Sequence, residues 1–159
     1  MKDNERRVTV APAVSIRRGA YDEAKQIKAV ASSHPYTKHF SHPAYCNRPA
    51  FAAGNVIVAT VNNTIVGLCS IRPKPTRNET EVDIICVMPE YRSYGIGAKL
   101  LDYVRKNLTT AVITLNVQTD NTRALAFYLN YGFSRRGTIT VANTEAYRMR
   151  MVCKRGVLI

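Results

Sequence analysis

A strand that runs into a helix through two closely spaced glycines constrains this chain more than any other feature. Residues 82–87 (VDIICV) are mostly apolar and β-branched, which predicts a buried strand. Gly95-Ile96-Gly97 then opens a stretch with apolar residues at helical spacing. Glycines at such a turn let backbone amides approach a phosphate with no Cβ in the way, and a helix N-terminus adds partial positive charge. The segment therefore predicts a pyrophosphate site.

The spacing of this loop matches neither of the two common phosphate loops. A P-loop requires Gly-Lys-Ser/Thr, whereas Gly97 is followed by Ala98-Lys99-Leu100, and a dinucleotide fingerprint requires a third glycine where this chain has Leu100. Residues 92–98 instead resemble the Arg/Gln-x-x-Gly-x-Gly/Ala loop of the GNAT acyltransferase superfamily. Residues 121–133 (NTRALAFYLNYGF) resemble its Asn-x-x-Ala-x-x-x-Tyr-x-x-x-Gly-Phe element and begin 24 residues after Gly97, which leaves room for one helix and one strand. The resemblance covers residues 14 to 154.

The resemblance implies an α/β (α+β) GNAT fold. Such a fold has a central mixed, mostly antiparallel twisted sheet of six to seven strands, flanked by about four helices and splayed at the acetyl-CoA site. The hydrophobic patterns predict strands at 14–18, 55–61, 65–72, 81–88, 111–117, 133–141 and 146–153. They predict helices at 22–32, capped by Asp22, at 95–108 and at 121–131, with short helices and loops from 36 to 54. We expect residues 1–13 to be a flexible lead-in and residues 14–159 to form one domain.

The resemblance also implies that acetyl-CoA is the co-substrate. Backbone amides between Arg92 and Ala98 are then expected to hold the pyrophosphate, and the amide of Val87 to face the thioester oxygen. The predicted cofactor-binding residues are Cys86, Val87, Met88, Arg92, Ser93, Tyr94, Gly95, Ile96, Gly97, Ala98, Asn121 and Tyr128.

The same resemblance assigns catalytic roles to Tyr128 and Glu81, and strand spacing adds Asp83. Tyr128 is expected to protonate the leaving thiolate, with packing in the core as the alternative. Glu81, eleven residues before Arg92, is expected to be the base, and Asp83 shares its strand face two residues on; a solvated strand end is the alternative for both carboxylates. The branch that acetylates ribosomal-protein N-termini keeps a glutamate on the next strand, where this chain has Asn116, which argues against that acceptor.

Histidines and cysteines give no metal-binding pattern. His34, His39 and His42 fall within nine residues, but their spacing offers no fourth ligand for tetrahedral zinc. They are interpreted as loop histidines, with a substrate-facing histidine as the alternative. The four cysteines have no C-x-x-C spacing, which predicts reduced thiols in the cytoplasm. No apolar run reaches the length of a membrane span, and the first ten residues lack the apolar stretch of a signal peptide.

The charge balance is strongly basic, with 23 Lys+Arg against 11 Asp+Glu and a net charge of +12. The phosphates of CoA need only a few of these cations, so an anionic partner is expected: nucleic acid, an acidic protein or the ribosome. The basic residues are scattered, however, which favours a general solvated surface. The leading hypothesis is an acetyl-CoA-dependent N-acetyltransferase, monomeric or homodimeric, that acts on a primary amine. The alternatives are an acyltransferase directed at tRNA or a modified base, and a catalytically silent CoA-binding regulator.

Overall fold

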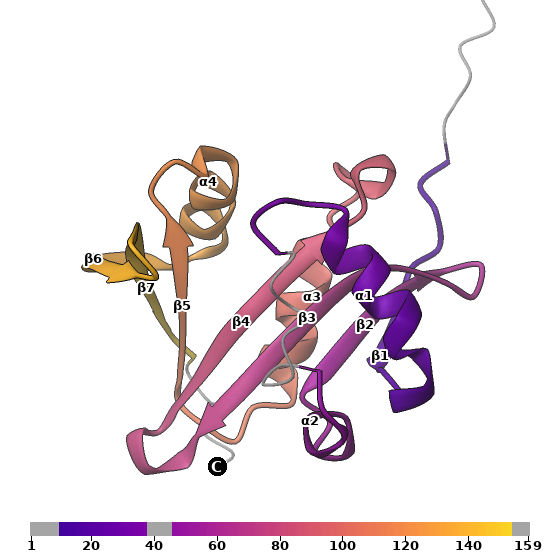
Figure 1. Ribbon diagram of the computed structural model, residues 1–159, viewed down its shortest axis with the longest axis horizontal. Helices are drawn as coiled ribbons and strands as arrows, with labels where there is room; N and C mark the ends of the chain where they lie inside the picture. Colours follow the sequence, from indigo (N-terminus) through magenta and orange to yellow (C-terminus); the bar gives the residue numbers. More distant parts are fainter. Residues whose placement is uncertain (1–9, 38–45, 154–159) are drawn as a thin grey trace, which may run out of the picture.

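The computed structural model describes residues 10–37 and 46–153, and it contains one seven-stranded sheet in the order β1-β2-β3-β4-β5-β7-β6 (Figure 1). The strands are β1 (Ser15–Arg18), β2 (Val56–Val61), β3 (Thr64–Lys74), β4 (Glu79–Val87), β5 (Val112–Gln118), β6 (Ser134–Val141) and β7 (Thr144–Val152). The described α-helices are α1 (Ala24–Ser32), α2 (Arg48–Ala52), α3 (Ile96–Lys106) and α4 (Thr122–Tyr131). Short 3-10 turns are η1 (Tyr21–Glu23), η3 (Pro75–Arg77) and η4 (Pro89–Tyr91). The predicted mixed sheet with about four helices is confirmed.

Three hairpins (β2–β3, β3–β4 and β6–β7) and one crossover explain most of the strand directions. Asn62-Asn63 joins β2 to β3 and Ala142-Asn143 joins β6 to β7, and all four residues have positive φ. Two successive positive φ angles give a tight turn whose twist suits antiparallel strands. Between β4 and β5 the chain instead crosses the sheet through α3, so these two strands are parallel while the other neighbours are antiparallel.

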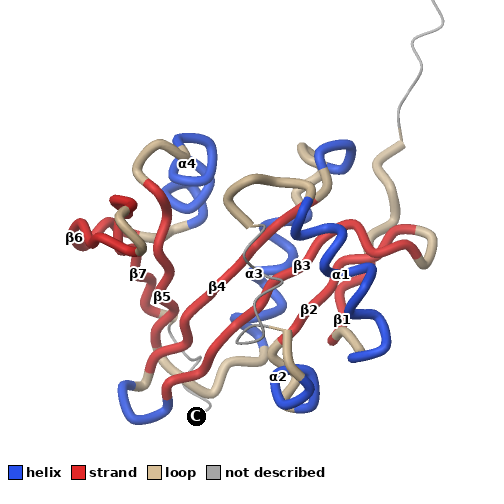
Figure 2. Tube along the Cα trace, in the orientation of Figure 1, coloured by secondary structure: helices blue, strands red, loops and turns tan. Residues whose placement is uncertain are grey.

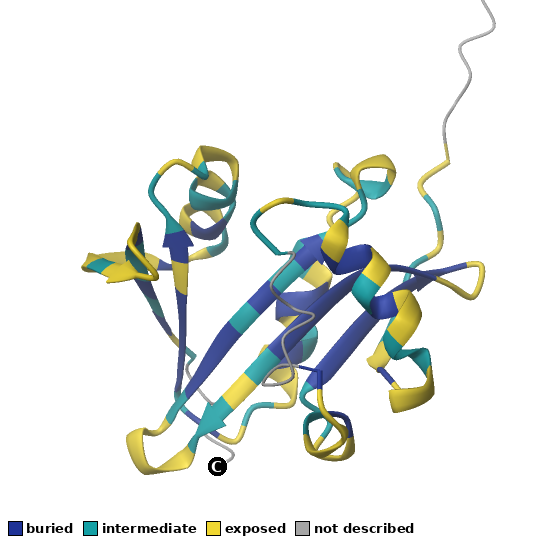
Figure 3. Cartoon of the chain, viewed as in Figure 1, coloured by how far each residue is buried: buried dark blue, intermediate teal, exposed yellow. Residues whose placement is uncertain are grey.

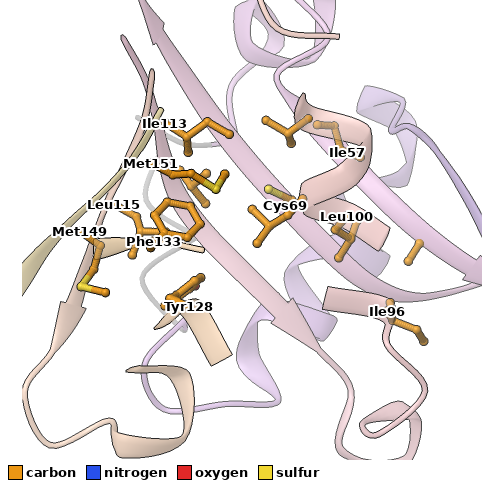
Figure 4. Packing of buried hydrophobic residues seen from close by; sticks show 14 of the residues in the cluster. Ile57, Cys69, Ile96, Leu100, Ile113, Leu115, Tyr128, Phe133, Met149 and Met151 are labelled. Atoms are coloured by element: carbon orange, nitrogen blue, oxygen red, sulfur yellow. The ribbon is translucent and has the colours of Figure 1, made fainter. Parts of the chain in front are cut away.

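Helices pack on both faces of the sheet. The stripe of α3 that predicted an amphipathic helix buries Ile96, Leu100 and Val104 against one face, in a core cluster that also contains Tyr128 of α4 (Figure 4). On the other face α1 packs Ile27 into a second cluster. Each fully buried aliphatic side chain contributes about 1.5–3 kcal/mol. The central strands are accordingly buried and β6 is mostly exposed (Figure 3).

The sheet opens between β4 and β5. These strands pair only where Glu79–Val82 lie beside Val112–Leu115, and beyond that point they diverge (Figure 2). A β-bulge marks the same place, because Ser70 pairs with Ile84 and Ile71 with Val82, which leaves Asp83 without a partner in the β3 ladder. A bulge bends its strand and increases the local twist. The splay that the resemblance implied is therefore present, and Asp83 lies where it starts.

Two local predictions were wrong. Asp22 does not cap α1, which begins after η1; the Glu23 carboxylate instead accepts the Ala20 N–H at 2.9 Å and forms an ion pair with Arg17. Strand β3 also continues past its predicted end at residue 72, with Pro73 opposite Thr80.

Within residues 10–37 and 46–153, no helix combines the length and apolarity needed to cross a membrane.

Candidate active site

The diverging ends of β4 and β5 enclose a cleft of about 800 Å³. The loop before α3 and the first turns of α4 form its other walls, and the segment after α1 and the β6–β7 hairpin line its far end. The predicted site residues that line it are Glu81, Asp83, Cys86, Val87, Arg92, Ser93, Gly95, Ile96, Gly97, Ala98, Asn121 and Tyr128. Met88 and Tyr94 lie outside this lining: Met88 packs against the α1–α2 core cluster, and Tyr94 is 40% exposed.

Backbone amides of β4 alternate between the sheet and the cleft. The Met88 N–H donates to the Val66 carbonyl oxygen at 2.8 Å, so the amides of Met88 and, two residues earlier, Cys86 face β3. By the same alternation the Val87 N–H faces the opposite edge of β4, where β5 no longer pairs with it. The Val87 carbonyl is occupied, because Arg92 Nε donates to it at 3.2 Å. The Val87 N–H thus points to the cleft as a donor. The Ile85 N–H, two residues earlier on the same strand, points the same way, and sequence reasoning missed it.

The loop before α3 forms a concave array of amides. Ser93 and Gly95 both adopt left-handed φ, 74° and 73°, which curls successive N–H groups toward one side. The first helical bond of α3 runs from Lys99 N–H to Gly95 O at 3.1 Å, so the amides of residues 96–98 have no acceptor within the helix. Together with the partial positive charge of the helix N-terminus, these amides can hold an anionic phosphate.

The two loop glycines serve different purposes. A Cβ at Gly95 would meet nothing within 4 Å and would project into open space, whereas its positive φ disfavours other residues. A Cβ at Gly97 would lie 3.1 Å from Cζ of Phe127. Gly97 therefore lets α4 approach α3, and the sequence-based expectation that its side-chain position faces the phosphate is corrected.

Tyr128 lies at the base of the cleft. Its ring packs edge-on to Phe133, with 5.6 Å between ring centroids, and only 7% of the residue is exposed (Figure 4). Burial, and then the neighbouring thiols of Cys69 and Cys86, raise the pKa of Tyr128 well above its ordinary value. The hydroxyl therefore keeps its proton at neutral pH. Asn121 caps the same helix, because its Oδ1 accepts the Ala124 N–H at 3.3 Å.

The two candidate bases share one arginine. Arg72 Nη2 lies 2.8 Å from Asp83 Oδ1 and 3.5 Å from Glu81 Oε1, so the carboxylates converge as predicted. Glu81 is also paired with Lys74. Burial raises the pKa of Asp83, and the adjacent Arg72 only partly opposes this effect. Asp83 is thus the carboxylate whose proton affinity is increased by its surroundings.

The far end of the cleft is positively charged. His34 stacks on Tyr36 with 5.2 Å between ring centroids, and both residues line the cleft. Burial and the charges of Arg92 and Arg123 lower the pKa of His34, so its imidazole is neutral at physiological pH. Arg123 was not predicted as a site residue; its position as the second residue of α4 gives no signal without the fold. His39 and His42 lie outside the described residues.

A splayed sheet, a concave array of amides at a helix N-terminus and a buried tyrosine, all opening onto one cleft, define the fold and site of an acyl-transferring enzyme. The chain belongs to the acetyltransferase (GNAT) family, whose model matches residues 21–133. It is an N-acetyltransferase.

Named relatives differ in their acceptors. The 5-NmdU N-acetyltransferase of Pseudomonas phage PaMx11 is 33% identical over 125 residues, which cover 78% of this chain and 89% of that protein. N-alpha-acetyltransferase RimI of Mycobacterium tuberculosis is 38% identical over 117 residues, covering 68% of this chain and 73% of RimI. The structure of Arabidopsis thaliana Naa50 in complex with the bisubstrate analogue CoA-Ac-MVNAL superposes with a TM-score of 0.70 at 26% identity, covering 89% of this chain and 99% of that chain.

Proposed function

We propose that this N-acetyltransferase uses acetyl-CoA and acetylates a primary amine by direct attack on the thioester. The observation that carries the proposal is the splay between β4 and β5, since it turns the Val87 amide toward the same cleft that Tyr128 and Asp83 line. Thioester aminolysis needs an anchored donor, a polarised carbonyl, a base and an acid. The cleft offers one group of the chain for each requirement.

The donor is held by backbone rather than side chains in this proposal. Amides of residues 96–98 bind the pyrophosphate, and the Val87 N–H donates to the thioester oxygen, where negative charge develops during attack. One such donor ordinarily contributes about 10²–10³ in kcat. Arg92 has a positioning role, because its bond to the Val87 carbonyl fixes the end of β4.

Asp83 is the better-supported base and Tyr128 the acid. The family resemblance put Glu81 first, but Glu81 is ion-paired with both Arg72 and Lys74. Among the described residues, Asp83 is ion-paired with Arg72, and burial increases its proton affinity. A carboxylate with a raised pKa accepts the ammonium proton more readily. The Tyr128 hydroxyl, protonated throughout the neutral range, then donates its proton to the departing thiolate. The presence of both groups in one cleft argues against a silent CoA-binding regulator.

An amine on nucleic acid is the second candidate acceptor, and two observations favour it. The net charge of +12 exceeds what one CoA molecule requires, and the phage relative is named for 5-NmdU. The RimI relative suggests protein N-termini as another acceptor. This chain, however, has Asn116 where the ribosomal-protein branch has its glutamate, which argues against that acceptor. None of the four cysteines, all of which lie within the described residues, forms a disulfide, which supports a reducing, cytoplasmic setting.

Thiol release from acetyl-CoA tests the proposal across a panel of acceptors. The panel contains polyamines, aminoglycosides, N-terminal peptides, tRNA and a DNA oligonucleotide that carries an alkyl amine on a pyrimidine. We expect acceptor-dependent release and a mass gain of one acetyl group on at least one member. Release at the same rate with and without every acceptor would contradict transfer to an amine.

A further inference from the structure

Two arginines of β7 project from the same face of the sheet as the candidate base. Arg148 pairs with Asn116 of β5, and Arg150 pairs with Thr114, which itself lies beside Glu81 of β4. Directly paired residues in neighbouring strands point to the same face. The alternating residues Ile113, Leu115, Met149 and Met151 point the other way, into the core with α3 and α4. The two arginines and the carboxylates therefore share one surface.

Arg148 stands at the edge of the cleft. Its Nη1 lies 3.5 Å from Oδ1 of Asn116, and Asn116 lines the cleft on the splayed end of β5. This single long contact leaves most of the five guanidinium N–H donors available. Within residues 10–37 and 46–153, the carboxylates that form ion pairs do so with Arg17, Arg72 and Lys74. The charge of Arg148, like that of Arg150, is therefore not neutralised by the described carboxylates.

We infer that Arg148 and Arg150 bind backbone phosphates of a nucleic-acid acceptor and so bring its amine-bearing nucleotide to Asp83. The inference rests on the proposed function and specifies its acceptor. Guanidinium forks match phosphate oxygens bidentately, and alternate residues on one strand lie about 7 Å apart.

The same arginines disfavour other acceptor classes and assist the chemistry. A polyamine or a lysine-rich peptide would bring further cations against two unneutralised guanidinium groups, which costs Coulombic energy. Positive charges near an ammonium group also lower its pKa. A phosphate-bearing acceptor is thus attracted to this surface while its amine is made easier to deprotonate.

Binding of an aminoalkyl-pyrimidine DNA oligonucleotide, followed by fluorescence anisotropy between about 50 and 200 mM salt, tests the inference. We expect Arg148→Gln to weaken binding roughly tenfold and to reduce the log–log salt slope by about 0.7–0.9. Arg148→Lys keeps the charge and should keep the slope while losing part of the affinity. The matched control is Lys106→Gln, which removes one exposed charge from α3 on the opposite face and should change neither quantity.

Two outcomes would overturn the inference while the proposed function stands. One is an unchanged salt slope for Arg148→Gln in a protein that still releases thiol with a small amine. The other is stronger competition by an acidic peptide than by an unmodified oligonucleotide, which would make the partner a protein. Should Arg148→Gln fail to fold, an Arg150→Gln variant with an unchanged slope decides against the inference in the same way. Absence of thiol release with every acceptor would instead overturn the proposed function, and the inference with it.

Discussion

Replacing Tyr128 by phenylalanine removes the proposed acid and little else. The ring packs against Phe127 and Phe133, at centroid distances of 5.2 and 5.6 Å, and Tyr128→Phe retains both contacts. Because only the hydroxyl is lost, we expect the free energy of unfolding to change by no more than about 1 kcal/mol. Acetyl-CoA affinity should also be unchanged, since backbone amides provide its binding.

The expected loss lies in the chemical step. A general acid contributes about 10²–10⁴ in rate, which corresponds to about 3–5 kcal/mol at 1.36 kcal/mol per decade. Burial raises the pKa of Tyr128, so the hydroxyl stays protonated over the range in which the enzyme is assayed. The ratio of wild-type to Tyr128→Phe kcat should therefore be constant with pH, and a descending limb of the wild-type profile should persist in the variant.

Single-turnover thiol release at saturating acceptor is the appropriate assay, because it isolates chemistry from product release. Tyr131→Phe is the matched control: its hydroxyl donates to Asp102 at 2.6 Å, outside the cleft lining, so kcat should stay within about twofold of wild type. An unchanged single-turnover rate for Tyr128→Phe, or equal losses for both variants, would refute the acid role and leave Tyr128 as core packing.

Three further predictions concern the loop glycines and the carboxylates. Gly95→Val should weaken CoA binding at least tenfold in calorimetry, and normal CoA binding by this variant would contradict the loop assignment. Gly97→Val should chiefly lower the free energy of unfolding, by about 1–3 kcal/mol, because the new side chain is overpacked against Phe127. Asp83→Asn should depress the ascending limb of kcat/KM against pH more than Glu81→Gln does, and the reverse ranking would move the base to Glu81. The pKa of Asp83 is raised in the folded state, so its protonation stabilises the fold. This contribution to the free energy of unfolding is complete below the pKa of the unfolded state and is lost as the pH rises through the pKa of the folded state. The Tm of Asp83→Asn minus the Tm of wild type should therefore increase as the pH rises through this window. A decrease of that difference would show that the Arg72 ion pair outweighs burial.

Much of the fold was predictable because its signals are local. Apolar or alternating stretches predicted the strands, and the apolar stripe from Ile96 to Val104 predicted α3. Asn121 and Gly132 mark the two ends of α4, as their residue types favour. The misjudged boundaries depend on longer-range contacts. Glu23 rather than Asp22 closes the turn before α1 because Arg17 of β1 binds it, and nothing within the helix sequence reveals that partner.

The site was less predictable because it depends on register. The order of motifs identified Val87 and the loop from Arg92 to Ala98, but which β4 amides face the cleft follows from the ladder with β3. The bulge at Asp83 and the contact between Gly97 and Phe127 are tertiary features. Arg148 needed the pairing of β5 with β7 before its position beside Asn116 could be recognised.

Amide hydrogen exchange with and without acetyl-CoA tests the central claim most directly, namely that backbone amides at the splay hold the donor. The account predicts slower exchange at Val87 and at residues 96–98 on binding, with the amides of Cys86 and Met88 already protected by β3 in the free protein. It also predicts no change at the C-terminal turn of α3. Saturating acetyl-CoA that leaves Val87 and residues 96–98 unprotected, or that protects a different part of the sheet, would contradict it.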